Sequence, residues 1–275
     1  MPELAEVEFF RKRWHLAAKG ERVKAVLGHD QKKLLRELDW PAFRRALVGT
    51  RFESSEARAK QMLFRFGGGN WLGVHLGMSG ELAVAPPGHV PGKHDHLVIV
   101  TTGHALVFND PRMFGRVQFH RGRQPPDWWT KIAPPILSKD FTVTAVGAFL
   151  RRRARAPIKA VLLMQERFPG VGNWMADEIL WRAAIHPARL AGSLQPPEVR
   201  TLWRECRTVC RQALAAIAGR GRKLPKDLNA GIPRTWLFKH RWRRGGRCPI
   251  TGKPLAHATI GGRTTCWSPA RQKFP

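Results

Sequence analysis

Residues 168–190 read FPGVGNWMADEILWRAAIHPARL, and this stretch predicts two helices joined by a turn region. Gly170 and Gly172 allow the backbone to approach a neighbour closely, and Asn173 can cap the helix that follows. Pro187 ends that helix and redirects the chain. The first N–H groups of a helix have no partner within it, so they can bind phosphate. Helical hairpins are common, and the stretch alone is therefore only moderately specific.

The charge of the whole chain supports a polyanionic partner. The 275 residues include Lys+Arg 48 against Asp+Glu 20, which gives a formal net charge of +28. Nucleic acid is the first candidate for that partner and an anionic membrane the second. No apolar run approaches the roughly 20 residues that span a bilayer, and no signal peptide is recognisable. We therefore expect an intracellular protein that does not insert into a membrane.

The pattern along the chain predicts an α+β protein with three parts. After an N-terminal helix, strand-like segments separated by Gly, Pro and Asn predict an antiparallel β domain over residues 2–130. Helical periodicity dominates residues 131–227, and residues 228–275 form a short basic tail with the strand-like segments WLFKHRWRR and GGRTTCW.

The four cysteines do not form the framework of a secreted protein. Cys206 and Cys210 lie one helical turn apart, whereas Cys248 and Cys266 lie in the tail. We expect all four to be reduced thiols.

The first ten residues, MPELAEVEFF, contain a candidate nucleophile. Removal of Met1 is expected before a small proline and leaves the secondary amine of Pro2 between Glu3 and Glu6. An α-amino group has a reference pKa of about 7.7–8.0 against about 10.4 for lysine, so more of it is neutral at pH 7. A neutral amine can attack a sugar aldehyde carbon to form an iminium, and the carboxylates can move the protons. From the glutamates alone, the favoured alternative is that they complement the helix dipole.

Two further stretches, VHLGMSG and NDPRMFGRV, place bulky or basic residues beside Gly or Pro. Met78, Arg112 and Phe114 are the residues concerned. An apolar wedge with an arginine can fill the space that a base leaves when it is extruded from duplex DNA. For each residue taken alone, folding onto the core is the preferred alternative.

Taken in order, these stretches resemble the Fpg/Nei family of DNA glycosylase/AP lyases. The resemblance runs from PELAEVE through EARAKQML, HLGMSGEL, KHDHLVI, NDPRMFGR and GVGNWMADEILWRAAIHP to GGRTTCW, and it covers nearly the whole chain. It implies an N-terminal antiparallel β-sandwich with an N-terminal helix over 2–130, a helix–two-turns–helix domain over 131–227 and a C-terminal finger hairpin over 228–275. It also implies a DNA cleft between the first two domains.

The resemblance also implies a role for each matching residue. Pro2 matches the Schiff-base nucleophile, Glu3 the acid/base that assists ring opening and elimination, and Glu6 a supporting carboxylate. The family's residues that bind backbone phosphates are matched by Lys60, His75, Asn173 and Arg263. Its void-filling triad is matched by Met78, Arg112 and Phe114. Its basic residue near the lesion is matched by Lys159.

The tail departs from the zinc-binding members of the family. An ungapped comparison puts Cys248, Thr251, Ser268 and Arg271 at the four ligand positions. Structural zinc needs four donors and strongly prefers thiolate and imidazole, so we expect no zinc and no cofactor. His257 and Cys266 could join Cys248 only at a spacing that fits no compact ligand pattern. The tail resembles the zincless fingers of plant formamidopyrimidine-DNA glycosylases and of one vertebrate endonuclease VIII-like enzyme, in which GGRTT keeps the working arginine, here Arg263.

We therefore expect a bifunctional DNA glycosylase/AP lyase of base excision repair that acts as a monomer on double-stranded DNA containing oxidised bases or abasic sites. It would cut the strand by β,δ-elimination. Bacterial formamidopyrimidine enzymes have a threonine-rich loop that closes over oxidised guanine, and residues 219–233, at the corresponding place here, do not resemble it. Formamidopyrimidines or oxidised pyrimidines are therefore alternatives to 8-oxoguanine as substrates. A catalytically silent binder of damaged DNA and a general coating protein for nucleic acid are the other two hypotheses.

Overall fold

The computed structural model describes residues 1–28, 35, 38–243 and 245–274. The chain forms two compact units. Unit 1 comprises residues 1–132 and 218–224, and unit 2 comprises residues 133–217 and 225–275. No helix in the described ranges is long and apolar enough to cross a membrane.

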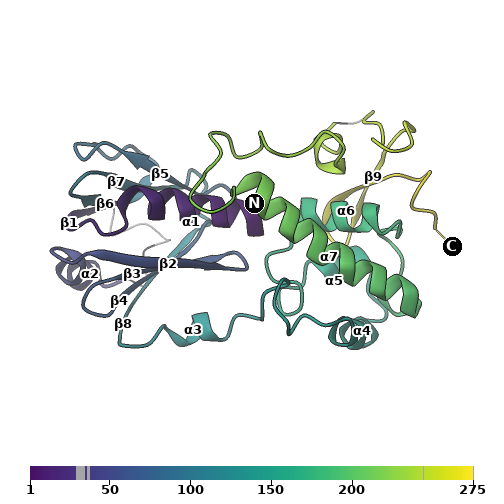
Figure 1. Cartoon of the computed structure of the whole chain (residues 1–275), viewed down its shortest axis with the longest axis horizontal. Helices are drawn as coiled ribbons and strands as arrows, with labels where there is room; N and C mark the ends of the chain where they lie inside the picture. Colours follow the sequence, from purple (N-terminus) through teal and green to yellow (C-terminus); the bar gives the residue numbers. More distant parts are fainter. Residues whose placement is uncertain (29–34, 36–37, 244, 275) are drawn as a thin grey trace. The chain divides into compact units, whose positions relative to one another are not determined.

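Unit 1 is built on two antiparallel four-stranded sheets, which Figure 1 shows as separate layers. The first sheet has the order β1 (Val23–Gly28), β6 (Asp95–Thr101), β7 (Ala105–Asn109) and β5 (Glu81–Ala85). The second has the order β2 (Phe52–Arg58), β3 (Gln61–Phe66), β4 (Asn70–His75) and β8 (Arg116–Arg121). On β3, every second side chain is completely buried, as expected for a strand with one face on the core. The short helices α2 (Trp40–Leu47) and α3 (Asp127–Thr130) complete the unit.

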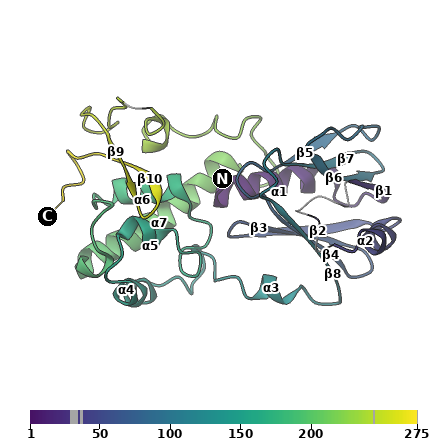
Figure 2. The ribbon, with the colours of Figure 1, turned by 180° about the vertical axis from the view of Figure 1, so that it is seen from behind.

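The N-terminal helix α1 (Leu4–Ala18) packs against the edge strands of both sheets, β5 and β2 (Figure 2). Trp14 is completely buried, and its indole N–H donates to the carbonyl of Ala83 on β5 at 2.8 Å. The same ring packs against Phe64 of β3, with 5.1 Å between centroids. Both sheets therefore fix the position of α1.

The stretch RFESSEARAKQMLFRF, residues 51–66, folds as a hairpin of β2 and β3. The turn lies at Ala59 and Lys60, where Arg58 pairs with Gln61. Ala59 has a φ of 54°, a conformation that costs energy for a residue with a Cβ. The hairpin places Lys60 at its tip.

Unit 2 is mainly helical. Its helices are α4 (Val143–Arg152), α5 (Ile158–Leu162), α6 (Asn173–Arg182) and α7 (Pro196–Ile217), with 3-10 turns η2 (Ala191–Ser193) and η3 (Leu237–Lys239). Helix α6 packs against α5, α7 and the C-terminal hairpin, so it is the centre of the unit. The segment WLFKHRWRR, expected to be strand-like, is not a strand where it is described: its regular part is η3, and its side chains Leu237 and Phe238 are buried.

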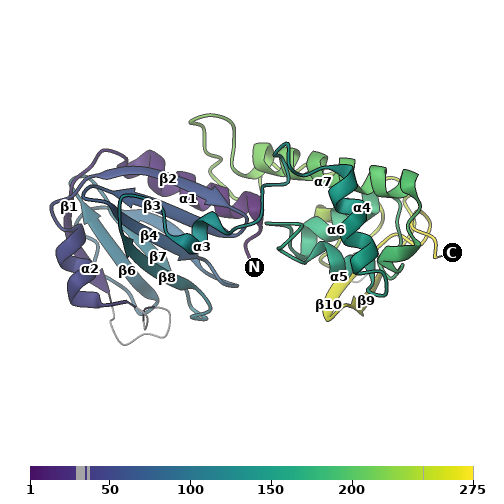
Figure 3. The ribbon, with the colours of Figure 1, turned by 90° about the horizontal axis from the view of Figure 1, so that it is seen from below.

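The C-terminal hairpin pairs β9 (Ala256–Ile260) with β10 (Arg263–Trp267). Its two turn residues, Gly261 and Gly262, both have positive φ, which a two-residue hairpin of this kind requires. A Cβ on Gly261 would lie 2.6 Å from the Cβ of Ala160 in α5, so the turn rests directly on that helix. Figure 3 shows the yellow hairpin beside α5.

Residues 218–224 are attached to α1 by one buried lysine. The ammonium of Lys12 donates to the carbonyls of Ala218 at 2.6 Å, Gly219 at 3.3 Å and Lys223 at 3.2 Å. Burial lowers the pKa of Lys12 from its usual value. Three carbonyl acceptors compensate the buried cation and hold the segment on unit 1.

Replacing Lys12 by Met should loosen this segment, because Met keeps the apolar stem and removes all three donors. A hydrogen bond to a charged group is worth about 1.5–3 kcal/mol, so amide exchange within residues 218–224 should accelerate by at least about 10-fold. Hydrogen–deuterium exchange with mass spectrometry measures this directly. Lys24→Met, on an exposed position of β1, is the matched control. Equal exchange in both variants would show that Lys12 is not the anchor.

Candidate nucleic-acid site

The start of α1 holds two buried carboxylates beside Pro2. Glu3 is 2% exposed and Glu6 is 6% exposed. The backbone N–H of Glu3 donates to Oε2 of Glu6 at 3.2 Å, and the two residues form a capping box at the helix start. Met1 is present and exposed, so the nitrogen of Pro2 belongs to a peptide bond here. The two glutamates therefore have a structural function as helix caps, and they are also held next to the position at which the free amine would appear.

Lys60 and His75 form a second group on the same unit. Lys60 is at the tip of the β2–β3 hairpin, and Gln61, its neighbour, pairs with His75 at the end of β4. Burial lowers the pKa of His75, and the positive charges of Lys60 and Arg116 lower it further. Nδ1 of His75 accepts the N–H of Gly77 at 3.1 Å, so a neutral ring carries its proton on Nε2. That N–H can donate to an anion without a charge on the ring.

The two loops that carry Met78 and Phe114 are joined by a buried aspartate, Asp110. Its carboxylate accepts the hydroxyl of Ser79 at 2.7 Å and the backbone N–H of Gly115 at 2.7 Å, so it bonds to both loops. Asp110 has no exposed surface. Sequence analysis did not identify its role, because an Asp before Pro is typical of any turn.

Close backbone contact also joins these loops. Gly77 has a φ of 61°, and a Cβ there would lie 2.3 Å from the carbonyl carbon of Phe114. Met78 and Phe114 nevertheless remain 40% and 54% exposed. The guanidinium of Arg112 lies 4.9 Å from the centroid of the Phe114 ring. The structure therefore brings the three predicted wedge residues onto two connected loops and exposes them, which argues against the alternative that they fold onto the core.

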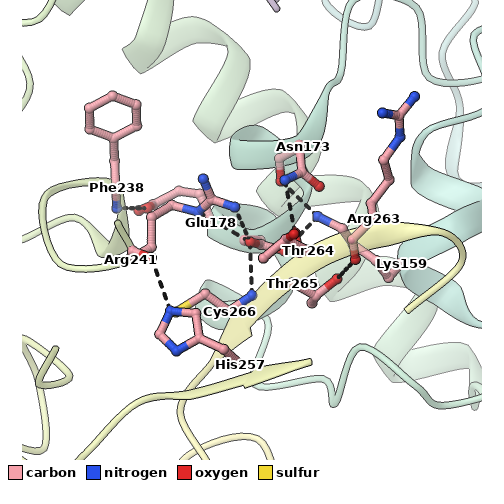
Figure 4. A network of polar contacts seen from close by, with 11 residues as sticks. Lys159, Asn173, Glu178, Phe238, Arg241, His257, Arg263, Thr264, Thr265 and Cys266 are labelled. Carbon is pink, nitrogen blue, oxygen red and sulfur yellow. Dashed lines mark hydrogen bonds and ion pairs between the residues drawn. The ribbon is translucent and has the colours of Figure 1, made fainter. Parts of the chain in front are cut away.

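In unit 2, Asn173 and the finger strand are in direct contact. The N-cap of α6 is Gly172, and Asn173 is the first helical residue, so the expectation that Asn173 caps the helix is wrong. Its Nδ2 instead donates to the carbonyl of Thr264 at 2.8 Å, next to exposed Arg263 (Figure 4). Oδ1 of Asn173 is buried without a hydrogen-bond partner among the described residues. The two predicted phosphate-binding residues of this unit are thus neighbours.

Lys159 does not lie at the surface. Its side chain is completely buried, and Nζ donates to Asp177 at 2.5 Å and to the carbonyl of Asn173 at 2.7 Å. Asp177 also accepts two N–H groups of Arg241, at 2.6 and 3.1 Å, and the N–H of Cys266 at 3.0 Å. In this conformation Lys159 therefore positions Asn173 rather than offering its own charge to DNA. Sequence analysis missed Asp177, which lies in an ordinary helical pattern.

Two of the four finger positions at which zinc ligands are not expected, Cys248 and Arg271, contact the end of α6. The indole N–H of Trp181 lies 3.4 Å from Sγ of Cys248, and both residues belong to a buried cluster with Cys266. Arg271 donates to the carbonyls of Trp181 at 2.7 Å and Arg182 at 2.9 Å, the last residues of α6. Burial raises the pKa of Cys266 to about 12, so this thiol is protonated at neutral pH. Within the described ranges, no three His, Cys, Asp or Glu residues form a metal-binding group, and all four cysteines are free thiols.

Comparison with known proteins gives matches over almost the whole chain. Residues 1–117 match the formamidopyrimidine-DNA glycosylase N-terminal domain, and residues 132–223 match the formamidopyrimidine-DNA glycosylase H2TH domain. The formamidopyrimidine-DNA glycosylase of Laribacter hongkongensis is 35% identical, over 99% of this chain and 100% of that protein. That of Geobacter sulfurreducens is 36% identical, with the same coverage.

A solved structure agrees with the fold described above. The enzyme of this family from Thermus thermophilus is 32% identical and superposes with a TM-score of 0.78 over 98% of both chains. The family models, the curated relatives and the solved structure therefore agree, and this protein belongs to the formamidopyrimidine-DNA glycosylase family.

Proposed function

We propose that this protein is a bifunctional DNA glycosylase and AP lyase, in which the amine of Pro2, freed from Met1, forms a Schiff base with the damaged nucleotide's sugar. The observation that carries the proposal is the pair of buried carboxylates, Glu3 and Glu6, held against the start of α1. A carboxylate at the start of a helix stabilises it well when the carboxylate is exposed, so capping alone does not require Glu3 and Glu6 to be buried. A DNA-binding module would need the basic residues but neither the terminal amine nor the two acids.

The chemistry follows from these groups. The neutral amine attacks the anomeric carbon, and the base leaves with a proton from an acid such as Glu3. The amine then loses its proton to a carboxylate, Glu3 protonates the ring oxygen, and the bond from that oxygen to the anomeric carbon breaks, which opens the sugar and leaves an iminium. The iminium withdraws electrons and acidifies the neighbouring C–H, so a carboxylate base can start elimination of the 3′ phosphate and then of the 5′ phosphate.

DNA binding is assigned to polar groups on both units, which range from buried Lys60 to exposed Arg263. Lys60 and neutral His75 on unit 1, and Asn173 and Arg263 on unit 2, are proposed to bind backbone phosphates. Met78, Arg112 and Phe114 are proposed to fill the space that the extruded nucleotide leaves. The net charge of +28 supports this partner.

Two classes of damaged base are proposed as substrates, in line with solved complexes of a structural relative. The Lactococcus lactis enzyme, 24% identical with a TM-score of 0.85, has been solved with DNA containing an oxidised pyrimidine and with DNA containing N7-benzyl-Fapy-dG. The region 219–233 lacks a threonine-rich loop, so both classes are alternatives to 8-oxoguanine as substrates. The second hypothesis, a silent binder of damaged DNA, would follow directly if Met1 were retained.

Borohydride trapping tests the Schiff base. Wild-type protein, with removal of Met1 verified by intact mass, should form a covalent adduct with DNA that contains one abasic site, and peptide mapping should locate it at Pro2. Pro2→Leu should retain Met1, because leucine is large, and should lose the adduct by at least about 100-fold. An adduct on a lysine, or none with Met1 removed, would contradict the mechanism and favour the silent binder.

The phosphate contacts should appear in the salt dependence of DNA binding. Lys60→Ala and Arg263→Ala should each weaken binding to every lesion alike and reduce the slope of log K against log salt by about 1. Lys24→Ala and Arg211→Ala are the controls, at exposed positions of units 1 and 2. Fluorescence anisotropy over a series of salt concentrations measures both quantities. A loss confined to one lesion would argue against a phosphate contact.

Phe114→Ala should impair base extrusion more than strand cleavage. Without the Phe114 ring, nothing replaces the stacking that the damaged base loses when it leaves the duplex. Excision of an oxidised base opposite an intact base should therefore slow by about 10-fold or more. Cleavage at a pre-formed abasic site should change by less than about 3-fold. Val90→Ala, at a position that is 81% exposed, is the control. Single-turnover kinetics on the two substrates give the comparison, and equal loss on both would overturn the wedge assignment.

A further inference from the structure

Unit 2 has a basic hollow to which the proposed function assigns no role. It has a volume of about 570 Å³ and is lined by Phe149, Arg152, Arg153, Glu166 and Arg167. The first three residues come from the end of α4, and the last two come from the loop that leads into α6.

Three positive charges converge on one ring in this hollow. The guanidinium carbons of Arg152, Arg153 and Arg167 lie 5.4, 5.6 and 5.9 Å from the centroid of Phe149. The ring is 3% exposed and forms the floor beneath the guanidinium groups. Cation–π attraction holds each arginine there, but the three like charges repel one another.

The carboxylate in the lining does not balance these charges. Glu166 pairs with Arg153 at 2.8 Å, and both side chains are about half exposed. Within the described part of the chain, Arg152 and Arg167 make no ion pair. The lining therefore has a net charge of about +2, which an anion in the hollow would neutralise.

Arg167 also has an unsatisfied donor. Its Nε is buried and has no hydrogen-bond partner in the described structure. A buried N–H without a partner costs about 1–3 kcal/mol, so it is normally satisfied by protein, water or ligand. The planar fork of a guanidinium matches the paired oxygens of a phosphoryl group. This donor distinguishes the hollow from an ordinary basic surface.

The loop that carries Arg167 is fixed by the side chain of Gln165. Its Nε2 donates to the carbonyls of Leu163 and Val171, each at 2.9 Å, and its Oε1 accepts the N–H of Gly170 at 3.0 Å. These hydrogen bonds connect the two ends of the loop to each other through Gln165. An anion that binds at Arg167 therefore meets a preorganised site, which lowers the entropy cost of binding.

We propose that this hollow is a phosphoryl-binding site, with Arg152 and Arg167 as the principal ligands and Phe149 as the floor that orients them. The phosphoryl group is carried either by the backbone of DNA or by a free nucleotide. The site is separate from the residues proposed above to bind backbone phosphates, since it shares no residue with them.

Calorimetric titration of the full-length protein with pyrophosphate tests the site. Arg167→Gln and Arg152→Gln should each weaken binding by at least about 10-fold, because each removes a principal charged donor. Arg211→Gln, an equal loss of charge at an exposed position of α7, should change it by less than about 2-fold. Thermal unfolding of each variant verifies folding. Absence of saturable binding, or equal effects of the three variants, would overturn the proposal.

The same variants distinguish the two sources of the phosphoryl group. If DNA supplies it, Arg167→Gln should weaken binding to a long abasic duplex, flatten its salt slope by about 1 relative to Arg211→Gln, and abolish competition by pyrophosphate. If a free nucleotide supplies it, Arg167→Gln should bind DNA as Arg211→Gln does and should lose binding of nucleoside triphosphate. Either result supports the site and identifies its ligand. Because the borohydride adduct forms at Pro2 and not at these arginines, the yield of trapping at saturating DNA should be unchanged in either case, so failure here is separable from failure of the lyase proposal.

Discussion

The attachment of α1 to both sheets is the constraint on which the proposed chemistry depends. A nucleophile at the end of a chain can act only if that end is ordered, and most chain termini are poorly ordered. Here Trp14 bonds to β5 and packs on β3, so the helix cannot move with respect to either sheet. The capping box at Glu3 and Glu6 then fixes the first turn, and Pro2 precedes it directly. The core of the β-sandwich thereby sets the geometry of a residue that is itself outside any sheet.

Unit 2 depends in the same way on one buried carboxylate. Asp177 is paired with Lys159 and Arg241 and bonded to the N–H of Cys266, so three segments distant in sequence meet at one group. A buried charge is tolerated only when its partners are in place, and loss of one partner is costly. The network therefore specifies how the hairpin lies on α6. This places Arg263 and Asn173 side by side.

Much of the fold could be predicted from periodicity and from the family's motifs. The α+β class, the N-terminal helix and the C-terminal hairpin at GGRTTCW were predictable, because local patterns of burial and glycine determine them. The strand expected in WLFKHRWRR was wrong, since burial of its aromatic residues against α6 favoured a 3-10 turn over strand pairing. The burial of Lys159 against Asp177 was not predictable, because a lysine in a helix gives no indication of whether an aspartate lies behind it.

By itself, the sequence determined the residue types at each motif, the charge of the chain and its membership of a family. Only the tertiary structure decided which of these residues are buried, exposed or paired. Asp110 connects two loops, and the arginines around Phe149 converge from a helix and a loop, across contacts that no local pattern contains. The physical reason is that secondary structure follows from short-range sterics and periodicity. Burial and charge pairing are instead properties of segments that meet only after the chain has folded.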